Sequence, residues 1–103
     1  MTPDEFVNEF KELRDSVQME YFSSNSEISR LKQLEDSGLN SEQIALVKSI
    51  VGDALTDSLY TVLLGLDGCA SISKYQETYK LFSESGEELT GEIESVAWEQ
   101  FHG

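Results

Sequence analysis

Apolar residues recur every three or four positions between residues 40 and 66, the spacing that places an apolar stripe on one face of a helix. Asn40 and Gln43 are spaced as a capping box at its start, and Gly65 and Gly68 suit its end. The stripe comprises Ile44, Val47, Ile50, Val51, Ala54, Leu55, Leu59, Val62, Leu63 and Leu66. At 1.5 Å per residue this helix would be about 40 Å long. We therefore predict a long central helix along which the other segments pack.

Two further helices are predicted before the central one. Thr2, Pro3 and Glu5 have the spacing of a capped helix start. The apolar face of this helix steps through Phe6, Phe10, Leu13, Val17 and Tyr21. Small polar residues at positions 23–26 favour a turn, and residues 27–36 then predict a shorter helix that Gly38 ends.

The segment after the central helix predicts a loop, a hairpin and a last helix. Residues 77–82 and 88–90 have the composition of two short strands around a turn at Gly86. Residues 91–102 place apolar side chains at helical spacing, with Thr90 as the expected cap. The predicted fold is mainly α (α+β): three amino-terminal helices including the long central one, a short β-hairpin and a carboxyl-terminal helix. It forms a single compact domain over residues 1–103.

Charge decides which partners are compatible with this chain. It has 20 acidic and 7 basic residues and a net charge of −13, so nucleic acids and anionic membranes are poor partners. The acidic excess is sharpest over residues 83–103, which carry no lysine or arginine. The apolar run at residues 59–66 is short for a membrane crossing, and no secretory signal pattern is visible. The expected location is cytoplasmic.

Catalytic chemistry has little support in the sequence. The only histidine, His102, lies next to the last residue, and the single cysteine, Cys69, is expected to be a small buried hydrophobe. The run from Asp67 begins like a calcium loop but has Ile72 and Thr78 where glycine and glutamate are required. No catalytic residue, cofactor or metal site is predicted. A small carboxylate enzyme with a divalent metal stays open as a minor alternative.

Residues 59–72 (LYTVLLGLDGCASI), 79–82 (YKLF) and 99–102 (EQFH) resemble small acidic bacterial proteins of toxin-immunity systems. The resemblance covers roughly the second half of the chain. It implies an immunity protein that binds a cognate toxin domain and blocks it stoichiometrically. It assigns no functional residues, because such proteins share no binding signature.

An acidic protein would associate rapidly with a basic toxin such as a nuclease. From the distribution of charge we predict a partner-binding surface made of Asp67, Glu84, Glu87, Glu88, Glu92 and Glu94. Trp98 lies beside the apolar stripe of the last helix, where its ring either packs on the rim of the core or anchors the partner. The alternative function is a helical interaction or regulatory module that forms a homodimer through the long helix.

Overall fold

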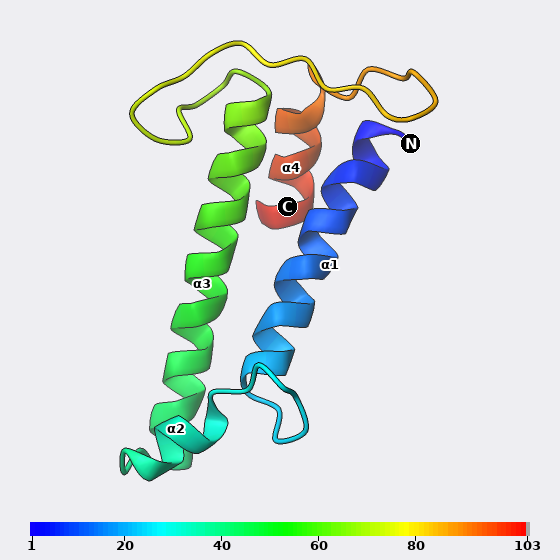
Figure 1. Cartoon of the computed structure of the whole chain (residues 1–103). Helices are drawn as coiled ribbons and strands as arrows, with labels where there is room; N and C mark the ends of the chain where they lie inside the picture. The colour runs from blue at the N-terminus through cyan, green and yellow to red at the C-terminus, as the bar shows by residue number, and fades with distance from the viewer. Residues whose placement is uncertain (103) are drawn as a thin grey trace.

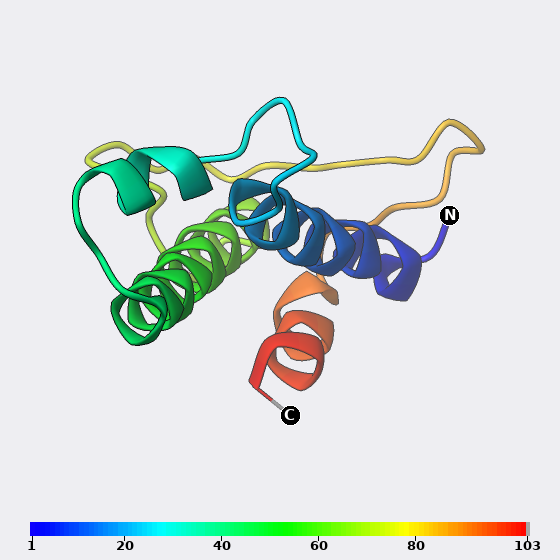
Figure 2. The same cartoon turned by 90° about the horizontal axis from the view of Figure 1, so that it is seen from below.

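The computed structural model describes residues 1–102, which form four helices joined by loops. They are α1 (Pro3–Tyr21), α2 (Leu31–Asp36), α3 (Ser41–Leu66) and α4 (Ile93–His102). α1 and α3 lie side by side along a molecule with principal extents of 49 × 29 × 24 Å (Figure 1). α4 packs against both of them on one face, and the loop after α3 runs over one end to the opposite face (Figure 2). The mainly helical prediction is therefore confirmed.

The starts of α1 and α3 are those that the sequence predicts. Thr2 Oγ1 accepts the Glu5 N–H at 3.2 Å while Glu5 Oε1 accepts the Thr2 N–H at 3.0 Å. Asn40 and Gln43 exchange the equivalent pair of hydrogen bonds at 2.9 Å each. Each capping box satisfies backbone donors that the helix itself leaves free.

The end of α3 is a Schellman motif. The Cys69 N–H donates to the Leu64 carbonyl at 2.9 Å and the Gly68 N–H donates to the Gly65 carbonyl at 3.2 Å. Gly68 has φ of +77°, a left-handed conformation that a glycine adopts without steric cost. This geometry turns the chain back toward α4, and it places Cys69 and its neighbours at the amino-terminal end of that helix.

The second predicted helix is shorter than expected. Residues 27–30 form turns, and α2 begins at Leu31. Serine hydroxyl groups accept the N–H groups of Asn25, Ile28 and Leu31 at 3.2 to 3.4 Å. These local hydrogen bonds compete with helical ones, because they offer the backbone donors a different partner.

The predicted β-hairpin is wrong, because residues 77–90 form one antiparallel bridge, between Phe82 and Glu88, and no sheet. Ser83 holds the turn, since its carbonyl accepts the Gly86 N–H and its hydroxyl accepts the Glu87 N–H. The Thr90 hydroxyl, instead of a carbonyl on a facing strand, accepts the Leu81 N–H at 3.3 Å. A two-stranded hairpin is marginal in water. Here the buried side chain of Leu89 anchors the segment to the core.

The core lies at the end of the molecule where α4 meets α1 and α3. Its fully buried apolar side chains are Val7, Leu63, Leu89, Ile93 and Ala97. No side chain is fully buried between residues 8 and 62. The end of the α1–α3 pair that is far from α4 is therefore much more exposed to solvent than expected, since the other segments were predicted to pack along the whole of the long helix.

The contact between α1 and α3 is more polar than the apolar stripe on α1 predicts. Leu13 was placed on that stripe but is 53% exposed, whereas Val7, outside it, is fully buried. The Arg14 guanidinium donates to Thr56 Oγ1 at 3.0 Å, and the Gln18 amide donates to the Lys48 carbonyl at 2.9 Å. Phe6 and Phe10 of the predicted stripe do pack against the core, whereas farther along α1 these long polar side chains join the helix to α3.

α3 is also the one helix in residues 1–102 that is long and apolar enough to cross a membrane, judged by length and composition alone. Its most apolar window has a mean hydropathy of 1.2 and is 11% buried. Core helices of soluble proteins pass the same test of length and composition, but they are mostly buried. The cytoplasmic location therefore stays a prediction.

Two glycines of α3 provide a matched test of how closely this helix packs against the rest of the chain. A Cβ at Gly65 would overlap Ile72 Cγ1 and lie 3.4 Å from the Ile72 backbone nitrogen, whereas a Cβ at Gly52 would meet only the flexible Gln18 amide. Alanine favours a helix by about 1 kcal/mol over glycine. We expect Gly65→Ala to lower the free energy of unfolding by about 1 kcal/mol net of this gain, because the loop must move. Gly52→Ala should change it by less than about 0.5 kcal/mol, since the gain offsets the lost Gln18 hydrogen bond. Urea denaturation followed by circular dichroism measures the free energy of unfolding of both variants. Equal effects would contradict the close contact between Gly65 and Ile72.

Candidate partner-binding surface

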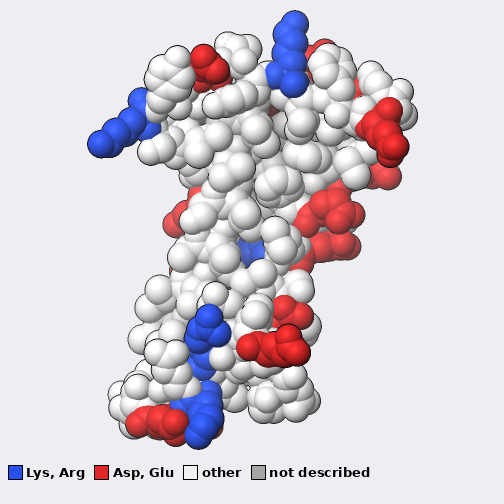
Figure 3. Space-filling model, in the orientation of Figure 1, with Lys and Arg blue, Asp and Glu red and all other residues white. Residues whose placement is uncertain are grey.

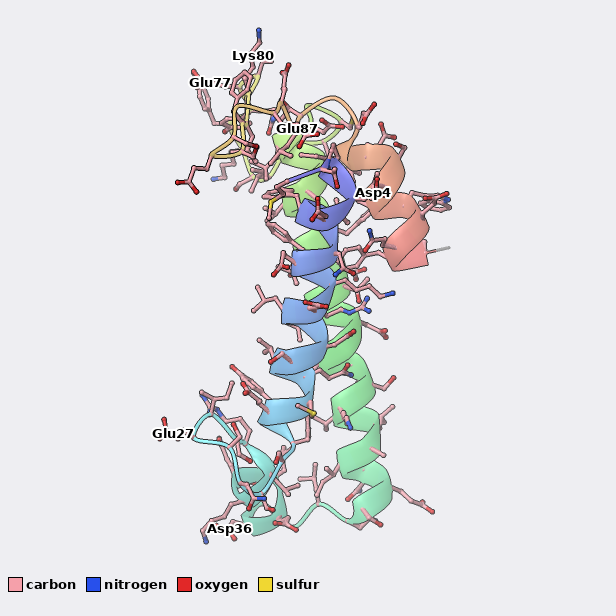
Figure 4. The ribbon with its side chains drawn as sticks, turned by 90° about the vertical axis from the view of Figure 1, so that its right-hand side faces the viewer. Asp4, Glu27, Asp36, Glu77, Lys80 and Glu87 are labelled. Atoms are coloured by element: carbon pink, nitrogen blue, oxygen red, sulfur yellow. The ribbon has the colours of Figure 1, made fainter. Side chains whose placement is uncertain are left out.

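The acidic residues are spread over the whole molecule. Glu77 and Glu87 project from the loop end, while Glu27 and Asp36 lie at the opposite end (Figure 4). On the face opposite α4, acidic side chains gather along the α1 edge and few charges occupy the middle (Figure 3). The net charge therefore does not by itself define one surface, and the local geometry around each predicted residue decides its role.

Asp67 has a structural role that the sequence did not indicate. One carboxylate oxygen accepts the Gly91 N–H, and the other accepts the Glu94 N–H at 3.0 Å. The residue that ends α3 thus caps the start of α4 and holds the two helices together. Thr90, the predicted cap, instead accepts the Leu81 N–H and donates to Glu88. The Asp67 carboxylate therefore has a role within the fold, where it accepts one backbone N–H at each oxygen.

Glu84, Glu87 and Glu88 occupy the loop beside the amino terminus. Glu87 Oε1 lies 3.4 Å from the Met1 amino group, and Glu88 Oε1 accepts the Thr90 hydroxyl at 3.2 Å. Glu84 lines a shallow pocket with Met1, Ser83 and Ser85. Figure 2 shows this loop tip next to the amino terminus, across the α1–α3 layer from α4.

Glu92, Glu94 and Trp98 lie on or just before α4. Glu92 is exposed in the turn before the helix, and its carbonyl accepts the Ser95 hydroxyl at 3.2 Å. Trp98 is 59% exposed, one turn along the helix from Glu94. The structure therefore separates the predicted residues into a loop group and an α4 group.

Glu94 and Trp98 of the α4 group line a surface pocket of about 520 Å³ together with Tyr60, Ser95 and Glu99, whereas Glu92 lies outside it. We call this the α4 pocket. The His102 ring lies between two aromatic neighbours, with its centroid 4.6 Å from that of Tyr60 and 5.0 Å from that of Trp98. The Tyr60 and His102 rings meet edge to face at 88°. This contact holds one wall of the pocket in place.

Cys69 is exposed, so its predicted burial is wrong. The Schellman turn brings its thiol to the surface beside α4, where Sγ donates to Glu94 Oε2 at 3.0 Å. This hydrogen bond, with burial and the charges of Glu94 and Asp67, raises the pKa of Cys69 from 9.0 to about 11. The thiol is therefore protonated at neutral pH and is a poor nucleophile.

The Cys69 pKa gives a prediction for thiol chemistry. The rate of alkylation by iodoacetamide should rise toward pH 11 and not level off near pH 9, because the thiolate is the reacting species. Glu94→Gln keeps an acceptor but removes the charge, and we expect it to speed alkylation at pH 8 by about tenfold or more. Glu99→Gln is the control and should leave the rate within about twofold, since Glu99 has no hydrogen bond to this thiol. A wild-type profile centred near pH 9 would contradict the contact.

Tyr60, Ser95 and Glu99 are pocket residues that the sequence reasoning missed. The spacing of Glu94, Trp98 and His102, four residues apart, indicates a shared helix face and could have been noticed. Tyr60 could not, because it comes from α3 and reaches the pocket only through tertiary packing.

Within residues 1–102, no group of three or more His, Cys, Asp and Glu side chains is arranged to hold a metal ion. Comparisons with protein-family models, with curated proteins and with solved structures find no match to this chain.

Proposed function

We propose that this chain is a non-enzymatic immunity protein that binds and neutralises a basic bacterial toxin domain, with the α4 pocket and its rim as the contact surface. The observation that carries the proposal is Trp98, 59% exposed between Glu94 and Glu99. Exposed tryptophans often dominate the energy of protein interfaces, and flanking charges select the partner and speed association. The net charge of −13 and the resemblance to small acidic immunity proteins support a basic toxin as the partner.

Co-expression tests this function. The carboxyl-terminal domain encoded by the open reading frame immediately upstream in the native genome is expressed in a test bacterium with and without this protein. Growth arrest that co-expression relieves, together with copurification of the two chains, is the expected result. Absence of toxicity or of a complex would contradict the proposal.

Charge-reversal variants test whether the toxin contacts the α4 group or the loop group of acidic residues. Glu94→Lys/Glu99→Lys should weaken the complex far more than Glu87→Lys/Glu88→Lys, because only the first pair lines the α4 pocket. Trp98→Ala should weaken it by about 2 kcal/mol, or about thirtyfold in Kd. Tyr75→Ala, which truncates another exposed aromatic residue, is the control. Calorimetry with the purified toxin domain measures all four variants.

A homodimer through α3 is the second candidate. Leu46 and Ile50, one turn apart on α3, are 62% and 56% exposed. Such a pair favours contact with another apolar surface, while the repulsion between two chains of charge −13 opposes it. Light scattering that gives twice the chain mass, reduced to a single chain by Ile50→Glu, would favour this candidate.

A further inference from the structure

The α4 pocket combines two kinds of recognition group. Tyr60 and Trp98 supply aromatic surface, and Glu94 and Glu99 supply carboxylates. Neither carboxylate forms an ion pair with any residue from 1 to 102. No lysine or arginine lines the pocket. The nearby Arg14 guanidinium lies 5.0 Å from the centroid of the Phe101 ring and is held by Thr56 and Asp15.

We propose that the α4 pocket accepts the guanidinium group of one arginine side chain of the partner. This inference rests on the proposed function, because it names the chemical group through which a basic partner is recognised. A guanidinium is planar and weakly hydrated, so it stacks on an indole face while its N–H groups donate to carboxylates. An ammonium group can form the ion pair but not the planar stack or the two-pronged hydrogen bond. The pocket volume of about 520 Å³ lies within the usual range for ligand sites.

The electrostatics of the pocket agree with this ligand. Burial raises the pKa of the Tyr60 phenol, and the negative charge of Glu94 raises it further. The negative charge of Glu94 therefore acts at Tyr60, where it would stabilise a bound cation and repel an anion. One Glu94 oxygen accepts the Cys69 thiol, which leaves its other oxygen to accept from a ligand.

Trp98 is the only tryptophan in the chain, so its fluorescence reports on the α4 pocket directly. The probe is the capped peptide acetyl-Gly-Arg-Gly-amide, titrated into the full chain at low salt. Its two comparison peptides replace arginine with lysine or with citrulline, which has the shape of arginine without the charge. We expect a saturable change in Trp98 fluorescence with the arginine peptide, at least threefold weaker binding of the lysine peptide and no saturable response to the citrulline peptide.

Charge-matched variants locate the binding. Glu94→Gln/Glu99→Gln should weaken binding of the arginine peptide at least fivefold. Glu27→Gln/Glu84→Gln removes the same charge from exposed sites outside the pocket and should change binding by less than twofold. Circular dichroism confirms that each variant is folded.

Equal responses to the arginine and citrulline peptides, equal binding of lysine and arginine, or equal weakening by the two double variants would each overturn the inference. The peptide titration needs no toxin, so its failure leaves the co-expression result intact. Conversely, a chain that binds arginine but fails to relieve toxicity contradicts the proposed function alone.

Discussion

Leu63→Ala should lower the free energy of unfolding by about 3 kcal/mol, the largest effect expected for a single truncation in this chain. The Leu63 side chain is completely buried, and it is the largest side chain for which this is true. It belongs to the small core at the meeting of α1, α3 and α4. A domain of this size has only about 5–15 kcal/mol in total, so the loss is a large part of its stability. The thermal midpoint should fall by about 10 °C or more.

Leu46→Ala is the matched control, because it makes the same truncation in the same helix where the side chain is 62% exposed. Its effect should stay within about 0.5 kcal/mol. Urea denaturation followed by circular dichroism, at a protein concentration where scattering shows one species, compares the two. Equal losses would show that the two halves of α3 are covered alike, contrary to the structure.

The features that the sequence predicted correctly are the ones that depend on near neighbours. Both capping boxes join residues three apart, so the pattern contains all the information that the contact needs. The same holds for Gly38 and Gly68, whose positive φ follows from their places after a helix. These local signals bound α1 and α3 almost to the residue.

The features that it missed depend on tertiary contacts. The pattern alone could not show that Arg14 and Gln18 join α1 to α3 in place of apolar side chains. Residues 77–82 have a strand-like composition, but none of their side chains is fully buried. The fully buried residue of this region is Leu89, from the other predicted strand, and the two segments form a single bridge. β-propensity reflects the neighbours a strand will have, and here the two segments pair at one bridge and no further strand extends it.

The candidate site shows the same division. Composition identified the acidic carboxyl-terminal segment, and the helical spacing of Glu94 and Trp98 contains the information that they share a face, although the prediction did not use it. Neither signal could assign Asp67 to the cap of α4 or bring Tyr60 from α3 to the pocket. A list of acidic residues therefore combined a helix cap, a loop beside the amino terminus and a pocket wall, which have different physical roles.

Asp67→Ala should lower the free energy of unfolding by about 2 kcal/mol, near the upper end for loss of a helix cap. The substitution leaves the Gly91 and Glu94 N–H groups without the carboxylate that accepts them, and it separates the end of α3 from the start of α4. Glu94 and Trp98 lie in the first two turns of α4 and line the α4 pocket, so the pocket should become less ordered as well. Asp67→Asn keeps one carbonyl oxygen and should lose about half as much.

Amide hydrogen exchange distinguishes loss of this cap from a general loss of stability. In Asp67→Ala the Glu94 amide should exchange at least tenfold faster under native conditions, while amides in the middle of α3 change only with global stability. Asp57→Ala is the control, since it removes an exposed carboxylate from the same helix and should leave the Glu94 amide unchanged. If the Glu94 amide were equally protected in Asp67→Ala and Asp57→Ala, Asp67 would not cap α4. If only the Asp67 variants lose protection, the fold of α4, and with it the geometry of the proposed binding surface, depends on a carboxylate 27 residues earlier in the chain.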